Sequence, residues 1–281
     1  MLLSINKADI EKLLDEVIAE LKASPLDLLS IGDKTGESVY LEHARSSYRR
    51  TLHDIIPVAE GIASDRQSVR ILEIGAFLGV VSCVLARLGF RVTAHDIPEF
   101  MENDRLALRY HSDRVTTITS NLRNYAMPAN DAAFDIVIMC ETLEHLNFNP
   151  LPVLAEINRI LSTSGYLYLA LPNQASLVNR TKLLFGKSIH NPVQDFFEQL
   201  DRTTNMIVGI HWREYTGAEL EELIVRSGFS IINHQYYTTH CATAPARVAY
   251  TLFPKLRSNQ TIIARKAQCT AHVYHFSEAT R

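Results

Sequence analysis

The sequence predicts an α/β protein in which a doubly wound, mostly parallel sheet follows an N-terminal helical extension. From residue 70 onward, short apolar runs rich in β-branched residues alternate with helical patterns, which is the order of βαβ units. These runs are continuously apolar rather than alternating, so we expect helices on both faces of the sheet. Residues 1–69 carry only helical patterns, and they are expected to form a helical cap or lid beside the sheet.

Two helices are expected in residues 1–69. Residues 9–22 repeat apolar side chains at helical spacing with charged residues opposite, which is typical of an amphipathic helix. Residues 38–56 show a second apolar stripe, and Pro57 is expected to end or kink that helix. We interpret both helices as packing elements, with contact to a substrate as the alternative.

The remaining elements follow in a regular order. Strands are expected at residues 69–75, 91–97, 115–121, 134–140, 166–173, 229–237 and 260–266. Helices are expected at residues 80–88, 99–110 and 216–228, and a further helix is expected to end within residues 153–165. No helix is expected between the last two strands. Residues 172–210 are interpreted as a lid insertion, and residues 267–281 show no strand or helix pattern, which predicts a disordered tail after the domain at 70–266.

Composition excludes several classes of function. The 281 residues are 47% hydrophobic and 21% charged, as in an ordinary globular protein. The formal net charge of -3 leaves no basic field for phosphate backbones, so we expect no nucleic-acid partner. The four cysteines are far apart and form no CxxC pair, and no histidine cluster has zinc-ligand spacing. We therefore expect reduced thiols and no metal.

The N-terminal sequence predicts a cytoplasmic protein without a membrane partner. The stretch MLLSINKADIEKLL has neither a basic leader region nor a long apolar core. No stretch reaches 18 uncharged apolar residues, which is the approximate length of a membrane-spanning helix.

The exit of the first strand predicts a nucleoside-type ligand. In doubly wound sheets, ligands bind beyond the carboxyl ends of the strands, where the strand order reverses. Gly75 and Gly79 allow a tight turn and close approach of a ligand, and the next helix offers its N-terminal amides. Asp96 ends the second strand 21 residues after Gly75, where a carboxylate can accept both hydroxyl protons of a ribose.

Two features of the loop favour S-adenosylmethionine over a dinucleotide. A dinucleotide needs the pattern G-x-G-x-x-G, but the bulky Phe77 stands where a second glycine is required. Glu73 lies inside an otherwise apolar strand, where its carboxylate can accept backbone amides of the glycine loop or attract a cationic ligand. S-adenosylmethionine is such a ligand, since it carries an ammonium and a sulfonium but no phosphate.

Five motifs in order carry a closer resemblance: VRILEIGAFLG, VTAHDI, FDIVIMCETLEHL, LYLALPN and WREYTGAELEELIVRSGF. They resemble the class I S-adenosylmethionine-dependent methyltransferases, in the branch that contains ubiquinone-biosynthesis O-methyltransferases and many enzymes of bacterial glycan and natural-product clusters. The resemblance covers residues 70–266 and implies a seven-stranded, Rossmann-like sheet in the order 3-2-1-4-5-7-6, with the last strand antiparallel. Phe77 departs from the family's usual second glycine, which puts the loop's path near the methionine moiety in doubt.

The resemblance also implies positions for the cofactor. Glu73 and the loop hold its methionine end, Asp96 holds the ribose, and Ile97 lies against the adenine. Asn121 is expected at the amino edge of the adenine and Cys140 beside the sulfonium. The alternatives are that Asn121 is an ordinary turn residue and Cys140 an ordinary core residue. The other expected cofactor contacts are Gly75, Ala76, Phe77 and Gly79 in the loop, Leu122 beside the adenine edge, and Glu141 near the sulfonium.

The motif CETLEHLNF is expected at the mouth of the pocket. His145 is a candidate general base for an acceptor hydroxyl, because imidazole titrates near neutral pH. The alternative is that His145 only braces the loop, and Glu144, the second catalytic candidate, is also open to a structural reading. Candidate contacts to the acceptor are His211, Tyr215 and His190.

Acceptor choice is expected to lie in residues 1–69 and in the insertion at 172–210. The insertion combines aromatic residues with Lys182, Lys187 and His190, which suits a sugar, a phosphorylated sugar or an anionic small molecule. The main hypothesis is a methyltransferase acting on a hydroxyl of a glycan precursor or secondary metabolite, as a monomer or homodimer. The alternatives are N- or C-methylation, an RNA or protein methyltransferase, and a non-catalytic protein that binds S-adenosylmethionine.

Overall fold

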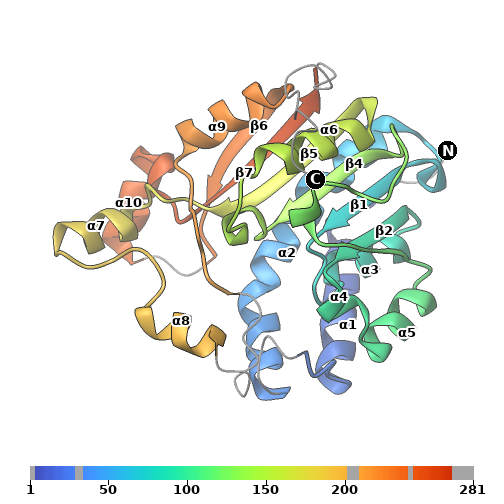
Figure 1. Cartoon of the computed structure of the whole chain (residues 1–281), viewed down its shortest axis with the longest axis horizontal. Helices are drawn as coiled ribbons and strands as arrows, with labels where there is room; N and C mark the ends of the chain where they lie inside the picture. The colour runs from blue at the N-terminus through green and yellow to red at the C-terminus, as the bar shows by residue number, and fades with distance from the viewer. Residues whose placement is uncertain (1–3, 29–33, 201–208, 240–242, 268–281) are drawn as a thin grey trace, which may run out of the picture.

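A seven-stranded sheet lies between two layers of helices in the computed structural model, which describes residues 4–28, 34–200, 209–239 and 243–267 (Figure 1). The strand order is β3-β2-β1-β4-β5-β7-β6, and β7 is antiparallel to both β5 and β6. The strands are β1 Arg70–Ile74, β2 Arg91–Asp96, β3 Thr116–Thr119, β4 Phe134–Cys140, β5 Leu161–Pro172, β6 Phe229–Tyr237 and β7 Asn259–Lys266. The order and the antiparallel strand expected from the sequence are both confirmed.

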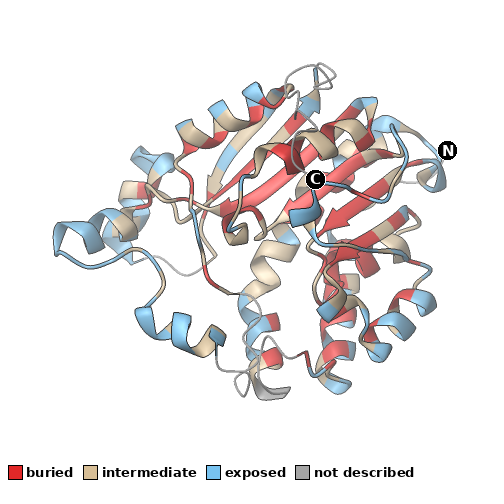
Figure 2. Cartoon of the chain, in the orientation of Figure 1, coloured by how far each residue is buried: buried red, intermediate tan, exposed pale blue. Residues whose placement is uncertain are grey.

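Helices cover both faces of the sheet, as the continuously apolar strands predicted. On one face, α3 (Val80–Arg87), the N-terminal helices and α5 (Asp104–Ser112) share a core with Ile71, Ile136 and Ile138. On the other face, α6 (Leu151–Ile160) and α9 (Gly217–Arg226) pack against Leu72 and Val137. Alternate residues of one strand therefore enter different cores, and the central strands are the most buried part of the molecule (Figure 2).

The N-terminal extension consists of α1 (Lys7–Ala23) and α2 (Lys34–Ile62). Pro57 lies inside α2, which continues to Ile62, so of the two expected effects, ending or kinking the helix, Pro57 does not end it. Proline removes one hydrogen bond of the helix. The fully buried Ile55, Ile56 and Ala59 on both sides of Pro57 keep the helix packed on the core, and this burial offsets the loss.

Two helical regions differ from the sequence expectation, and the insertion contains helices that the expectation had not placed. The helix expected at 99–110 is divided into α4 (Pro98–Met101) and α5, because Asn103 caps α5 by accepting a hydrogen bond from the Leu106 amide. The insertion forms α7 (Leu177–Leu184) and α8 (Val193–Leu200). Between β6 and β7 the chain forms an unexpected helix, α10 (Ala244–Leu252), which begins with a proline in its first turn and is largely exposed. Four short 3-10 helices complete the fold: η1 Arg66–Ser68, η2 Leu122–Asn124, η3 Leu143–His145 and η4 Pro254–Leu256.

No helix in the described ranges is long and apolar enough to span a bilayer. Cys83 and Cys140 are free thiols. The expected tail, apart from Ala267, lies outside the described residues.

Candidate functional site

The glycine loop joins β1 to α3 at the carboxyl end of the sheet. Gly75 and Gly79 adopt φ angles of 74° and 72°, a left-handed conformation that favours glycine. A side chain at Gly75 would meet Thr142, and one at Gly79 would meet Tyr110. Ala76, also expected at the cofactor, is buried and donates its amide to the His95 carbonyl of β2 at 3.1 Å. The glycines thus fit both a tight turn and close packing against two neighbouring elements.

Glu73 is buried at the centre of this arrangement. Its Oε2 accepts a hydrogen bond from the Ser82 hydroxyl of α3 at 2.5 Å. Burial raises the pKa of Glu73 to about 7, against the lowering effect of the Ser82 hydroxyl and amide. The carboxyl therefore bonds the first turn of the helix rather than the loop amides that the sequence suggested.

Asp96, at the end of β2, connects the first two strand exits. Its Oδ2 accepts a hydrogen bond from the Phe77 amide and its Oδ1 accepts one from the Ile97 amide, each at 2.8 Å. Burial raises the pKa of Asp96 to about 6, and the two amides oppose this shift. Neither Glu73 nor Asp96 forms an ion pair within the described ranges of the chain.

Phe77 takes a left-handed conformation, with φ 47°, at the position where the family usually has a second glycine. This conformation is strained for a bulky residue. The Phe77 ring makes edge-to-face contacts with Tyr40 of α2 at 5.3 Å and with Phe100 of α4 at 5.0 Å between ring centroids. Helix α2 therefore reaches the glycine loop, in addition to packing on the core.

The expected adenine-side residues lie on the neighbouring turn. Asn121 is exposed and its side chain caps η2 by accepting the Arg123 amide at 2.9 Å, which is the turn role kept open in the sequence analysis. Leu122 packs against the second core. Cys140 ends β4, with its sulfur 3.5 Å from the Thr51 hydroxyl of α2.

The loop after β4 brings the next expected residues to the same edge. Glu141 has φ 47°, another left-handed residue that is not glycine. The following Thr142 packs on Gly75, so the β1 and β4 exits touch directly. Loss of water around Glu141 raises its pKa to about 7.

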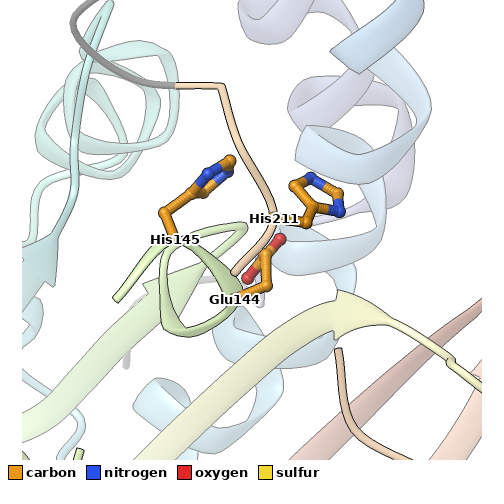
Figure 3. Close-up of side chains that lie close together, drawn as sticks. All are labelled: Glu144, His145 and His211. Carbon is orange, nitrogen blue, oxygen red and sulfur yellow. The ribbon is translucent and has the colours of Figure 1, made fainter. Parts of the chain in front are cut away.

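Three polar side chains gather beyond this loop (Figure 3). Glu144 and His145 come from η3, and His211 comes from the segment before α9; one ligand atom from each lies within 4.8 Å of the others. The His145 Nδ1 lies 3.0 Å from the Ile210 carbonyl oxygen, and the His211 Nδ1 lies 3.0 Å from Oε1 of Glu214. The Trp212 amide donates to the Glu144 carbonyl at 2.8 Å. These bonds hold two segments, far apart in sequence, against each other.

Burial sets the protonation of this cluster. It raises the pKa of Glu144 well above its usual value, with the nearby Glu141 charge as the second cause. It lowers the pKa of His145 to about 4, helped by the neighbouring His211. With a pKa of about 4, His145 is neutral at pH 7. Its ring then offers a lone pair, but it is a weak base at that pH.

The three residues expected to contact the acceptor lie in different parts of the structure. His211 lies beside His145, with ring centroids 4.9 Å apart. Tyr215 is buried in the second core, under the guanidinium of Arg213, and His190 is exposed between α7 and α8, outside the cluster. The residues that sequence reasoning missed are Glu214, Thr142 and Tyr40. For Glu214 a signal was available, because it follows His211 by three residues.

Part of the chain is similar in sequence to known methyltransferases. Residues 72–169 match the family described as methyltransferase domain. The curated relatives include the ubiquinone biosynthesis O-methyltransferases of Xanthomonas campestris pv. campestris and Xanthomonas oryzae pv. oryzae. Each is 30% identical over 145 residues, which cover 50% of this chain and 57% of the relative. The chain thus spans little more than half the length of these relatives.

Solved structures with the same fold are more distant in sequence. An S-adenosylmethionine-dependent methyltransferase from Methanosarcina mazei has a TM-score of 0.53 at 21% identity, covering 75% of this chain and 97% of that one. A magnesium protoporphyrin IX methyltransferase from Synechocystis, solved with bound SAH, has a TM-score of 0.52 at 15% identity, covering 81% and 87%. At these identities the likeness is one of fold.

Proposed function

We propose that this chain is a class I S-adenosylmethionine-dependent methyltransferase that moves a methyl group from S-adenosylmethionine to a hydroxyl of a small molecule. The motifs predicted such a domain, and the strand order together with the family match over residues 72–169 supports it. The activity, the acceptor and the roles of individual residues are the proposal.

One observation carries the choice of cofactor. Glu73 and Asp96 are buried beside the glycine loop, and neither has a cationic partner within the described ranges. Buried carboxyls without a partner are costly to ionise, and a ligand with an ammonium and a sulfonium supplies the missing positive charge. The same carboxyls repel a pyrophosphate, which agrees with the bulky Phe77 in the loop.

We assign the cofactor contacts to the residues at the strand exits. Glu73, Gly75, Ala76, Phe77 and Gly79 hold the methionine end, with Cys140 and Glu141 on its β4 side. Asp96 binds the ribose, and Ile97, Asn121 and Leu122 border the adenine. When bound, S-adenosylmethionine supplies a methyl group on a positively charged sulfur that is already a good leaving group.

The chemistry that remains for the protein is alignment and the removal of one proton. The acceptor oxygen would form a bond to the methyl carbon while the carbon–sulfur bond breaks with its electron pair staying on sulfur, and the hydroxyl proton would pass to His145, the candidate base. Holding the acceptor in line and excluding water supplies most of the acceleration. One ligand atom each of Glu144, His145 and His211 lies within 4.8 Å of the others. We place this group on the acceptor side of the cofactor, as the residues that would handle the acceptor hydroxyl.

The acceptor is proposed to be a sugar, a glycan precursor or a secondary metabolite. The curated relatives are ubiquinone biosynthesis O-methyltransferases, which supports a hydroxyl acceptor. The exposed Lys182, Lys187 and His190 of the insertion suit an acceptor with anionic groups. A monomer or homodimer in the cytoplasm remains a prediction from the sequence.

Calorimetry with S-adenosylhomocysteine tests the cofactor assignment. The wild type should bind it, and Asp96→Asn should lose about 1 to 3 kcal/mol of binding free energy, because the amide replaces a charged acceptor of buried hydrogen bonds. Asp131→Asn is the matched control, since Asp131 is 80% exposed and pairs only with Arg159 among the described side chains. It should bind as the wild type does. Equal affinity for all three proteins would show that the ribose lies elsewhere. A thermal shift with NAD or ATP but none with S-adenosylmethionine would overturn the proposed cofactor.

A further inference from the structure

A cleft of about 890 Å³ opens beside the cluster of three polar side chains. One wall is the chain from η3 into the start of α6, residues 146–151, and the other is formed by side chains of residues 212–226, which lead into α9 (Figure 1). Each wall begins directly after one histidine of the cluster, at Leu146 and at Trp212. The volume lies in the range of ligand sites, about 300 to 1,000 Å³.

Three aromatic side chains line this cleft, and Trp212 is the most exposed of them. The rings of Phe148 and Tyr215 each lie under an arginine guanidinium, whose carbon is 5.4 and 5.2 Å from the respective ring centroid. Trp212 is 41% exposed, although Phe196 of α8 contacts it with 5.8 Å between the ring centroids. Trp212 therefore presents a flat apolar surface to a molecule in the cleft.

Four charged side chains line the same cleft, and their charges balance. Arg213 pairs with Glu219 at 3.2 Å, and Arg226 pairs with Glu222 at 3.0 Å. These side chains are between 42% and 75% exposed, and exposed pairs of this kind contribute little to stability. A ligand can therefore exchange one of these hydrogen bonds for its own at small cost. The guanidinium groups donate and the carboxylates accept, so the cleft offers both kinds of partner.

This combination of side chains favours one chemical class of ligand. An anionic ligand needs a surplus of positive charge, which two arginines beside two glutamates do not provide. A purely apolar ligand would remove water from four charged side chains, which is costly. A sugar ring has a face of C–H groups and an edge of hydroxyls that both donate and accept. It therefore matches an aromatic plane bordered by arginine and glutamate side chains.

We infer that this cleft binds a neutral oligosaccharide, with a sugar ring against Trp212 and sugar hydroxyls bonded to the Arg226–Glu222 and Arg213–Glu219 pairs. The cleft is much larger than a single sugar ring, so it takes more than one sugar unit.

The role of this binding rests on the proposed function. Because both walls of the cleft begin at the cluster, an oligosaccharide in the cleft places its terminal sugar beside Glu144, His145 and His211. These are the residues proposed to handle the acceptor hydroxyl, so the acceptor class narrows to a glycan. Lys182 and Lys187 of the insertion are not among the residues that line the cleft, so a charged group elsewhere on the acceptor is compatible with it.

Tryptophan fluorescence tests the site without methyl transfer, because Trp212 is the single tryptophan of the chain. The full chain is titrated with glucose and with four neutral trisaccharides: maltotriose, cellotriose, chitotriose and mannotriose. A sugar ring that replaces water on the indole should shift the emission to shorter wavelength. At least one trisaccharide should bind at least about 10-fold more tightly than glucose, since further sugar units add contacts in the cleft. Trigalacturonate and a proline-rich peptide, which test an anionic sugar and a protein partner, should cause no shift.

Calorimetry with the tightest trisaccharide compares the variants. Trp212→Ala should weaken binding by at least about 10-fold, and Trp212→Phe, which keeps a ring, by no more than about 3-fold. Arg226→Ala should weaken binding by about 2- to 10-fold, the scale of one hydrogen bond. Arg91→Ala is the matched control, since Arg91 is an exposed arginine at the start of β2 and does not line the cleft. It should bind as the wild type does. Circular dichroism and affinity for S-adenosylhomocysteine, both close to wild type, show that each variant is folded.

The outcomes separate the two proposals. If the wild type binds S-adenosylhomocysteine but none of the neutral trisaccharides, or if folded Trp212→Ala binds them unchanged, the oligosaccharide site is overturned and the proposed function stands. An emission shift with trigalacturonate alone, or with the peptide alone, overturns the assigned class of ligand. Equal affinity for glucose and every trisaccharide overturns an extended site. If a trisaccharide binds in a Trp212-dependent way while S-adenosylhomocysteine does not bind, the site stands and the proposed function fails.

Discussion

At the scale of single residues, the proposed cofactor side of the site is a set of carboxyls kept away from water. Glu73 and Asp96 both have raised pKa values, about 7 and about 6, and burial is the first cause of each shift. An acid whose pKa is raised by folding stabilises the folded state at low pH and loses that contribution as the pH rises. The free protein therefore carries a stability cost near neutral pH that a cationic ligand removes.

Glu73→Gln measures this cost. Below pH 4.5 Glu73 is protonated in both the folded and the unfolded state, and between pH 4.5 and about 7 only the unfolded state ionises. The wild type should therefore lose about 3 kcal/mol relative to Glu73→Gln over that range, and the difference should stay constant at higher pH. Denaturant unfolding of both proteins at several pH values gives this difference. A difference that does not change with pH contradicts the raised pKa.

Residues with an unusual local context were the ones that the sequence could identify. Glu73 interrupts an apolar strand and Asp96 ends one, so each was visible without knowledge of the fold. Thr142 and Tyr40 have ordinary neighbours in sequence, and their importance comes from contacts with Gly75 and Phe77. Such contacts depend on where α2 and the β4 exit lie in space, which no local pattern encodes.

At the scale of elements, α2 links the N-terminal extension to the glycine loop. Tyr40 packs edge to face on Phe77, whose left-handed backbone is strained. Aromatic pairs of this kind contribute about 0.5 to 1.5 kcal/mol beyond their buried area. A glycine at this position would adopt the left-handed backbone without strain. The contact between Tyr40 and Phe77 offsets part of the strain that Phe77 introduces there.

A double-mutant cycle tests this coupling. Tyr40→Ala should weaken S-adenosylhomocysteine binding by about 2- to 10-fold, because the loop loses the contact that holds Phe77. In the Phe77→Gly background, where the backbone adopts this conformation without strain, Tyr40→Ala should have little effect. Calorimetry on the four proteins gives the coupling energy. Additive effects of the two substitutions contradict a supporting role for α2.

Strong periodic patterns made most elements predictable, and their boundaries failed where a side chain intervened. The central strands were found because buried parallel strands are continuously apolar. The division at Asn103 was not expected, and it arises because Asn103 caps a new helix. Helix α2 continues past Pro57, where only one of the two expected effects was an end of the helix, because its buried face outweighs the local propensity. Helix α10 was missed because antiparallel β6 and β7 need no crossover helix.

At the scale of the whole molecule, the insertion leaves and rejoins the sheet at one place. Asn173, just after β5, forms a bridge with Tyr215, and the Gln174 amide donates to the Tyr215 carbonyl at 3.2 Å. Close by, the Ile210 carbonyl and the Trp212 amide bond to η3. The site residues near His211 are thus held by the domain itself, in addition to a contact from Asn191 to the His211 amide.

Replacing residues 175–209 by a short Gly/Ser linker tests this independence. We expect a folded protein with affinity for S-adenosylhomocysteine within about 3-fold of wild type, since shortening a closed loop lowers its closure cost by about 1 kcal/mol. Turnover of the natural acceptor should be lost, because the proposed acceptor contacts are removed. Circular dichroism and calorimetry measure the first two properties. Loss of cofactor affinity would show that the insertion is part of the core.

The meeting of the insertion's two ends at Asn173 and Tyr215 has a consequence for how such proteins diversify. The two ends of the insertion lie side by side in the fold. The segment between them can therefore be exchanged between relatives while the strands on either side keep their neighbours. Glu144 and His145 lie before the exchanged segment, and His211 lies beyond residue 209 where it ends. If the insertion selects the acceptor, as we propose, exchange of this segment changes the acceptor range while Glu144, His145 and His211 are retained.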